Sequence, residues 1–489
     1  MRADRTRART VRRLASDTAP ADLILRNGRI VTPQGVVRGD LAVRGGEITA
    51  IGAVPQQAGR EIDAQGKWVL PGGVDPHAHI EQMSGMGLMN ADTFETATLS
   101  AAMGGTTSVI SFVAQAAGQR LRDAVGDYAA RARRGAMIDH AFHLIVADTT
   151  VPEFEDDLAA LIAAGHRSVK VFTTYNIRLD DAQILRLMRL ARHHGALICV
   201  HAENDAIISE ARARLIGAGR TSPADHARSR PPMAEIEAVE RMIRFAEYTG
   251  QPVMLFHIST AGAAEALRQA RARGAPVWGE TCPHYLLMTE EVLSRPHGAK
   301  WMCSPPQRGV ADQQALWRAL EDGTLDLVSS DHAPYRHDAT GKLSAGPQAG
   351  FHQIANGMPG LETRLPLMWD AMVNKGHGGV EAFARLTAEA PARLHGLLRK
   401  GRLAVGMDAD LVIWDETRER TYGEDDLHDN VGYNPWSGQQ LRGLPETVIL
   451  RGDLLVSDGV FHGRPGCGLW QNRQDFWLSK DREDRSAET

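Results

Sequence analysis

The strongest constraint in this 489-residue chain is an alternation of strand-like and helix-like runs between Pro71 and Arg393. Eight apolar stretches of strand length follow one another, and helical stretches such as DDAQILRLMRLARHHG separate most of them. Eight parallel strands joined by helices close as a (β/α)8 barrel, a fold of about 250 residues with room for insertions. We therefore predict an α/β TIM-like barrel rather than a doubly wound open sheet, since no G-x-G-x-x-G fingerprint follows the first strand. The expected strands are Trp68–Asp75, Thr106–Val113, Ile138–Ala147, Ser168–Tyr175, Ala196–Ala202, Pro252–Ser259, Pro276–Thr281 and Leu325–Ser330.

Both ends of the chain carry a different pattern. The runs DLILRNGRIV and GVVRGDLAVRGGEITAIG near the start, and GRLAVGMDADLVIWD near the end, are short, β-rich and broken by Gly, Asn and Asp. Such runs are typical of half-buried antiparallel strands. We predict one small β-sandwich domain built from residues 22–70 and 396–465, around a metal-dependent catalytic barrel over 71–395. Residues 1–21 are expected to form a flexible arm and 466–489 a C-terminal tail.

Composition excludes several classes of protein. A net charge of -5 argues against nucleic acid as the main partner. No run of about 18 apolar residues is present, so we expect no membrane span. The Arg-rich first twenty residues lack the apolar core of a secretory signal. The four cysteines, too few for a disulfide framework, favour a cytoplasmic location; they are Cys199, Cys282, Cys303 and Cys467.

Titratable side chains close several of the predicted strands. His77 and His79 end the first strand, and residues two apart in a strand point to the same face. His201 and His257 close two later strands, and Asp331 follows the eighth. Barrel enzymes build their sites from such carboxyl ends, so these five side chains predict a metal centre. Four other histidines are interpreted as structural: His140, His143, His332 and His337.

Lys170 is the sixth candidate ligand. It lies in the apolar fourth strand, RSVKVFTTY, of a chain that has only seven lysines. A buried ammonium group needs a partner or loses its charge. An edge position or a salt bridge is one interpretation. The other is that the neutral amine adds CO2 and becomes a carbamate that bridges two metals, which arginine cannot do because its guanidinium stays protonated.

Ten segments, found in the order of the family, make the chain similar to the cyclic amidohydrolases, the group of dihydropyrimidinases, hydantoinases and allantoinases. The similarity runs from about Asp22 to Gly466. It implies a hydrolase that opens dihydropyrimidines or 5-substituted hydantoins to N-carbamoyl amino acids by means of a hydroxide bridging two metals. The segments are PGGVDPHAHI, AAMGGTTSVISF, SVKVFTTY, VHAEN, HIST, GETCPHYL, CSPPQR, SSDHAPY, NGMPGLETRLPL and GMDADLVIWD.

The resemblance also implies a role for each site residue. His77, His79 and Asp331 would hold one metal, His201 and His257 the other, and carboxylated Lys170 would bridge them. Asp331 would move the proton. Tyr175 matches the oxyanion donor, and Ser304 and Asn356 match positions that bind the ring amide. Zinc is the expected metal, with manganese also suited to these ligands. Relatives form homotetramers, so we expect a tetramer or dimer.

One loop bears on the substrate. Met83, Met86, Leu88 and Met89 follow the first barrel strand and suit either ordinary loop packing or a pocket for an apolar ring substituent. The alternatives are an allantoinase or dihydroorotase, whose polar rings would call for polar contacts, and a non-catalytic assembly protein of the same fold. The second alternative conflicts with six filled ligand positions.

Overall fold

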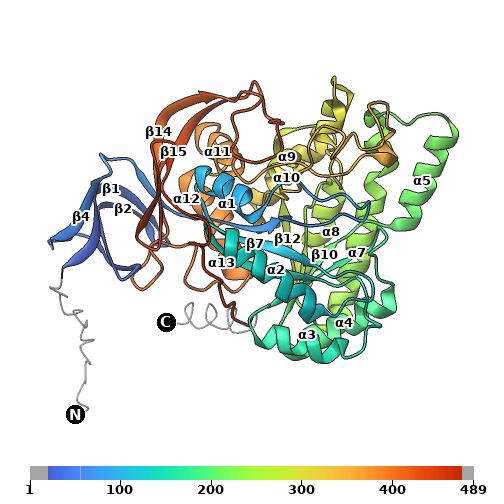
Figure 1. Ribbon diagram of the computed structural model, residues 1–489, viewed down its shortest axis with the longest axis horizontal. Helices are drawn as coiled ribbons and strands as arrows, with labels where there is room; N and C mark the ends of the chain where they lie inside the picture. Colours follow the sequence, from blue (N-terminus) through green and yellow to red (C-terminus); the bar gives the residue numbers. More distant parts are fainter. Residues whose placement is uncertain (1–19, 56, 476–489) are drawn as a thin grey trace, which may run out of the picture.

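The structure is a computed structural model that describes residues 20–55 and 57–475. Its two sheets lie side by side, and helices surround the larger body (Figure 1). No helix among these residues is both long and apolar enough to cross a membrane. The predicted arm 1–21 and tail 466–489 lie largely outside the described residues, and the predicted domain limits stay a prediction.

The larger sheet contains eight parallel strands bonded in chain order from β6 to β13. A parallel bridge between Ala78 and His332 joins the region of the first strand to the residues after the last. This confirms the predicted TIM-like barrel. The strands are β6 Gly73–Ala78, β7 Thr106–Ala114, β8 Asp139–Ile145, β9 Ser168–Phe172, β10 Leu197–His201, β11 Val253–Leu255, β12 Val277–Thr281 and β13 Leu327–Val328.

Local sequence explains the helices around the barrel, as α4 illustrates. Asp180 and Gln183 form a reciprocal capping box at its start, and Gly195 ends it with φ 72°. Its buried residues repeat at helical spacing and face the barrel: Ile184, Leu187, Met188 and Ala191. The helices are α1 Phe94–Met103, α2 Leu121–Gly135, α3 Phe154–Ala163, α4 Asp181–His194, α5 Asp205–Gly217, α6 His226–Ser229, α7 Pro232–Thr249, α8 Ala261–Ala272, α9 Pro283–Leu287, α10 Val310–Glu321, α11 Arg364–Trp369, α12 Gly379–Ala384 and α13 Ala390–Leu394.

The second sheet unites the two ends of the chain, as predicted. Strand β1 pairs with β5, and β5 pairs with β14, so blue and red strands lie together in Figure 1. Leu23, Val69 and Leu411 share its buried core. The strands are β1 Ala21–Thr32, β2 Gly35–Arg44, β3 Glu47–Gly52, β4 Ala58–Asp63, β5 Trp68–Pro71, β14 Leu411–Thr421, β15 Gln440–Leu450, β16 Asp453–Ser457 and β17 Val460–Phe461.

One predicted strand is wrong in its extent. Trp68–Asp75 is two strands, β5 in the terminal sheet and β6 in the barrel. The chain changes sheet at Gly72, where an added Cβ would lie 2.1 Å from Thr107 Oγ1. Only glycine fits against the neighbouring barrel strand there. The last strand is also shorter than predicted, because the Ser330 N–H bonds the Asp75 carboxylate instead of a strand.

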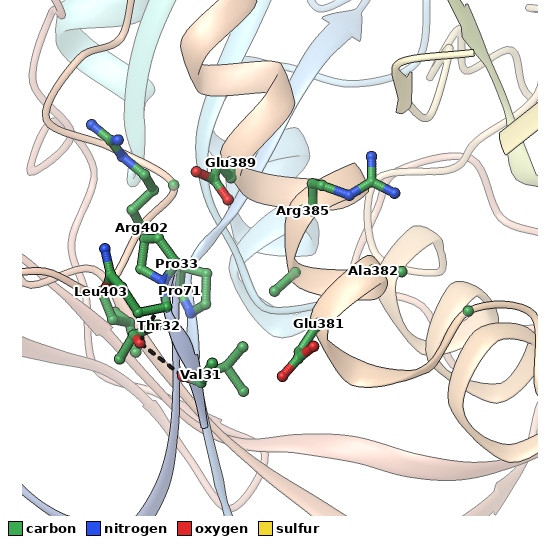
Figure 2. A pocket seen from close by; sticks show the side chains of 15 residues that line it. Val31, Thr32, Pro33, Pro71, Glu381, Ala382, Arg385, Glu389, Arg402 and Leu403 are labelled. Carbon is green, nitrogen blue, oxygen red and sulfur yellow. Dashed lines mark hydrogen bonds between the residues drawn. The ribbon is translucent and has the colours of Figure 1, made fainter. Parts of the chain in front are cut away.

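Two features, a buried ion-pair cluster and a cavity, lie where the terminal sheet meets the amino-terminal end of the barrel. Lys400 is buried there and bonds Asp139, Asp410 and Asp408 at 2.6, 2.8 and 2.9 Å. A cavity of about 580 Å³ lies nearby, between Thr32 on the sheet side and Glu381 on the helical side (Figure 2). Its lining contains none of the predicted site residues.

Candidate metal centre

The carboxyl ends of the barrel strands bring the six predicted ligands together. His77 lies in β6 and His79 follows it, Lys170 lies in β9, and His201 ends β10. The other two, His257 and Asp331, follow β11 and β13 within three residues. Apart from the half-buried His79, all of these side chains are buried. Parallel strands present their carboxyl ends at one mouth, which explains the convergence.

Contacts among these residues define two neighbouring groups. Asp331 Oδ1 lies 3.0 Å from His77 Nε2 and 3.6 Å from His79 Nε2, a set of three potential ligands for one ion. The ring centroids of His201 and His257 are 4.5 Å apart, and those of His77 and His257 are 5.5 Å apart. The two groups therefore adjoin each other across the barrel mouth.

The amine of Lys170 is fully buried and has no hydrogen-bond partner within the described chain. It lies 3.9 Å from the ring centroid of Phe256 and 5.0 Å from that of Phe172. Burial lowers the pKa of Lys170 to about 8. The lowered pKa therefore raises the fraction of neutral amine, the form that reacts with CO2, above that of an exposed lysine.

The outward nitrogens of three histidines are held by residues that the sequence reasoning missed. Glu280 bonds His77 Nδ1, Gln82 Oε1 lies 2.6 Å from His79 Nδ1, and Glu203 Oε2 lies 2.7 Å from His201 Nε2. Such partners fix the ring and leave the opposite nitrogen for a metal. Position in the chain offered a signal: Glu203 is two residues after His201, and Glu280 lies near the end of a barrel strand.

Charge is balanced around these partners. Glu203 is fully buried and forms an ion pair with Arg230. Burial raises the pKa of Glu203, but Arg230 and His201 together lower it more, to about 2. His77 follows the same logic with opposite sign: burial lowers its pKa, while Asp331 and Glu280 raise it to about 9. Two buried acids thus flank one imidazole, and bound metal ions would supply positive charge beside them.

Backbone strain gathers at the mouth. Tyr175, His257 and Asp331 have φ of 71°, 42° and 46°, in the left-handed region that residues other than glycine rarely adopt. Each such residue costs about 1–3 kcal/mol and persists where its surroundings enforce it. The strain turns these side chains at the point where each strand stops.

The predicted substrate-binding residues lie beside the ligands. The ring of Tyr175 is 5.3 Å from that of His201, and Arg230 lies 4.7 Å from its centroid. Burial raises the pKa of Tyr175, whereas Arg230, Ser304 and Asn356 lower it. The Ser304 hydroxyl and the Asn356 amide oxygen are buried near Tyr175, and neither meets a partner among the described residues at good hydrogen-bonding geometry. These unpaired polar atoms can receive a ligand.

Lys342, another residue that the sequence reasoning missed, supports Ser304 and Asn356. Its buried ammonium bonds the carbonyls of Met302 at 3.0 Å and Ala355 at 2.9 Å. These carbonyls lie two residues before Ser304 and directly before Asn356. Burial lowers the pKa of Lys342 to about 7. One side chain therefore ties the segments of Ser304 and Asn356 together.

The methionine loop after β6 borders the same mouth. Met83, Met86 and Met89 are 52%, 50% and 46% exposed, which is unusual for such apolar side chains. Gln82 anchors this loop to His79, and Asn176 bonds the carbonyl of Gly85 at 3.3 Å. An apolar, adaptable surface is therefore fixed next to the ligands.

Comparisons with known proteins agree with this geometry. The Amidohydrolase family model matches residues 68–455. A D-hydantoinase from Rhizobium radiobacter is 39% identical, covering 93% of this chain and 99% of the relative. A D-phenylhydantoinase from Escherichia coli O127:H6 is 38% identical, covering 93% and 98%.

Solved structures give the same result. A D-hydantoinase superposes with a TM-score of 0.90 at 38% identity, covering 93% of this chain and 99% of the other. The dihydropyrimidinase from Brevibacillus agri has a TM-score of 0.89 at 36% identity, with the same coverage. The resemblance inferred from the ten sequence segments is confirmed. The chain belongs to the amidohydrolase family, among relatives that include D-hydantoinases and dihydropyrimidinases.

Proposed function

We propose that this chain hydrolyses a cyclic amide, opening dihydropyrimidines or 5-substituted hydantoins to N-carbamoyl amino acids. The observation that carries the proposal is the buried amine of Lys170, which has no hydrogen-bond partner among the described residues and lies on the strand next to the one that His201 ends. A lysine in such a place costs free energy unless it gains a function or a partner. As a carbamate it would carry the negative charge that two metal ions need between them.

The donor set fits a pair of divalent ions. His77, His79 and Asp331 would hold one, His201 and His257 the other, and carboxylated Lys170 both. Imidazole and carboxylate ligands suit Zn2+ first and Mn2+ second. When bound, such ions lower the pKa of water from about 15.7 toward about 7 and polarise a carbonyl. The orphaned Nδ1 of His257 supports the fit, since a buried imidazole nitrogen ordinarily has a partner.

Side chains of the protein then transfer the proton of the attacking water and stabilise the negative charge on the carbonyl oxygen. The carboxylate of Asp331 accepts the proton of the attacking water and delivers it to the ring nitrogen as the C–N bond breaks. The Tyr175 hydroxyl donates a hydrogen bond to the carbonyl oxygen, which becomes negative in the transition state. Ser304 and Asn356 hold the ring amide in register with these groups. One C–O bond forms, one C–N bond breaks, and the proton ends on nitrogen.

The methionine loop favours apolar substituents on the ring. Met83, Met86 and Met89 offer exposed apolar surface at the mouth, whereas allantoin and dihydroorotate carry strongly polar groups. Ring openers with an aryl or alkyl group are therefore the preferred substrates. We also propose that the enzyme is cytoplasmic and acts on a small molecule. It is expected to form a homotetramer or homodimer, and sedimentation of the purified protein tests this oligomeric state.

A substrate panel tests the function. Purified protein is assayed on dihydrouracil, hydantoin, 5-phenylhydantoin, allantoin and dihydroorotate, with metal content measured alongside. We expect about two metal ions per chain and the highest kcat/KM on 5-phenylhydantoin or dihydrouracil. A higher kcat/KM on allantoin or dihydroorotate than on the other rings would contradict the proposed substrate class and favour an allantoinase or dihydroorotase. Absence of both metal and activity would favour the non-catalytic alternative.

A further inference from the structure

The main-chain carbonyls that lead to Ser304 are bonded by side chains from other parts of the chain. Each of the four consecutive carbonyls of residues 300–303 accepts a hydrogen bond from a different buried side chain. The bonds are Tyr433 to Lys300 at 3.1 Å, Gln307 to Trp301 at 3.0 Å, Lys342 to Met302 at 3.0 Å and His226 to Cys303 at 2.8 Å. We call the four donors the carbonyl clamp, and each of them is at most 2% exposed.

Ser304 interrupts this pattern. The next carbonyl, that of Pro305, again accepts a bond, from the Tyr285 hydroxyl at 2.8 Å. Within residues 300–305, Ser304 is thus the position whose carbonyl no described side chain bonds. Buried backbone groups ordinarily have partners, so the neighbouring carbonyls are fixed while the polar groups of Ser304 are left for a ligand.

The clamp is assembled from separate parts of the fold. His226 begins α6, and Gln307 lies just beyond Ser304. Lys342 lies between β13 and α11, and Tyr433 lies in the connection between β14 and β15. The last donor therefore comes from the terminal sheet and not from the barrel.

The connection that carries Tyr433 is built to reach the barrel. It covers residues 422–439, whereas an antiparallel pair of strands can be joined by about 2–5 residues. It contacts the segment before Ser304 twice more, because Trp301 Nε1 donates to the Pro435 carbonyl at 3.0 Å and Lys300 pairs with Glu424. The terminal sheet thus holds the start of the Ser304 segment from outside.

Lys342 extends the clamp to the second amide-binding segment. Besides Met302, it bonds the carbonyl of Ala355 at 2.9 Å, directly before Asn356. The Met302 carbonyl also accepts the N–H of Gly357 at 2.8 Å, directly after Asn356. The positions of Ser304 and Asn356 are therefore coupled through one carbonyl and one ammonium group.

We propose that the carbonyl clamp positions Ser304 and Asn356 for the ring amide and thereby sets KM, an inference that rests on the proposed function. Its members are positioning residues, because they act through the main chain of residues 300–303. Supporting groups of this kind hold a binding site within a fraction of an ångström of its productive geometry. The metal ligands keep their places when the clamp is loosened, so binding should weaken while kcat stays nearly constant.

Steady-state kinetics of Tyr433→Phe and Lys342→Met on hydantoin and 5-phenylhydantoin test the clamp. Tyr433→Phe removes one hydroxyl and keeps the buried ring, and loss of one hydrogen bond should raise KM by about 2- to 10-fold. Lys342→Met should raise KM further, because it releases both segments. The factor should be equal on the two rings, since they share the amide and differ only in the substituent. Metal content should stay at the wild-type level.

Two variants serve as controls. Lys400→Met removes another buried lysine, far from residues 300–304, so it should lower stability and leave KM unchanged, as a purely structural role would. Tyr248→Phe, at an exposed tyrosine, should change neither. If Lys342→Met does not fold, Tyr433→Phe alone decides.

Unchanged KM in Tyr433→Phe on both rings would overturn the role of the clamp, and so would a fall in kcat at constant KM. A change in KM on only one ring would also overturn it, because the substituent and not the amide would then be affected. These outcomes leave the proposed function intact as long as the wild-type protein hydrolyses the rings. A wild-type protein that hydrolyses no ring of the panel would overturn both.

Discussion

The two ends of the barrel hold a buried lysine in opposite ways. At the amino-terminal end, Lys400 bonds three carboxylates. At the carboxyl end, the amine of Lys170 is buried and has no hydrogen-bond partner among the described residues. A buried polar group left unpaired costs about 1–3 kcal/mol. The difference indicates that the protein itself neutralises Lys400, whereas Lys170 is placed to hold something that the chain does not supply.

Replacing Lys170 should affect turnover most. Lys170→Ala removes the bridge between the two ligand groups, so we expect loss of bound metal and a decrease in kcat/KM of at least about a thousandfold. Lys170→Arg should behave likewise, since guanidinium cannot add CO2. Metal content and rates measured with and without propionate check this, because a small carboxylate should partly restore Lys170→Ala alone. Lys375→Ala, at an exposed lysine, is the control.

Tyr175→Phe should come next. Loss of one oxyanion donor typically lowers kcat by about 100- to 1,000-fold. Metal content should stay unchanged, because the hydroxyl belongs to none of the proposed ligands. Steady-state kinetics with metal analysis separate the two effects. The exposed Tyr248 offers a control in Tyr248→Phe. A variant that lost metal along with rate would contradict the assigned role.

Glu280→Gln should have a smaller effect. The amide keeps a hydrogen bond to His77 but removes the negative charge behind it. Changes of this type cost about 10- to 100-fold in metal affinity or activity. Competition with a chelator measures the affinity, and excess metal should recover most of the rate. Glu265→Gln on the outer surface is the comparison, and equal losses in both variants would refute the positioning role.

Lys400→Met should barely change turnover per folded molecule. The substitution leaves three carboxylates at the amino-terminal end without their cationic partner. Breaking a buried ion pair in this way lowers the free energy of unfolding by about 3–5 kcal/mol. Chemical denaturation followed by circular dichroism measures the loss. Lys300→Met, at a lysine paired with Glu424 nearer the surface, should cost less. A large fall in kcat without a fall in stability would erase the contrast between the two ends.

The convergence of the six candidate side chains was predictable because it follows chain periodicity. His77 and His79 are two apart, three others close or follow apolar runs, and Lys170 lies within one, so strand geometry aims them at one mouth. The sheet built from both chain ends was predictable from the alternation of apolar and polar residues in its strands. The residue limits of the two domains are still only predicted.

Other features depend on packing that no local pattern reveals. The division of Trp68–Asp75 into two strands depends on Thr107 filling the space beside Gly72. Lys342 reaches carbonyls on two segments that only the folded chain brings together. The positions of Glu203 and Glu280 near strand ends could be read from the sequence. Their roles could not, because these depend on which imidazole nitrogen faces outward in the folded protein.

The pairing of β5 with β14 places Trp68 beside Trp414, with the whole barrel between them in the chain. During synthesis, the edge of β5 has no neighbour until almost the last strands have left the ribosome. Closing so long a loop is slow, and an open strand edge invites pairing with other chains. The yield of folded protein should therefore depend mainly on how well the open edge of β5 is protected from pairing with other chains during synthesis. The free energy of unfolding of the finished barrel should matter less.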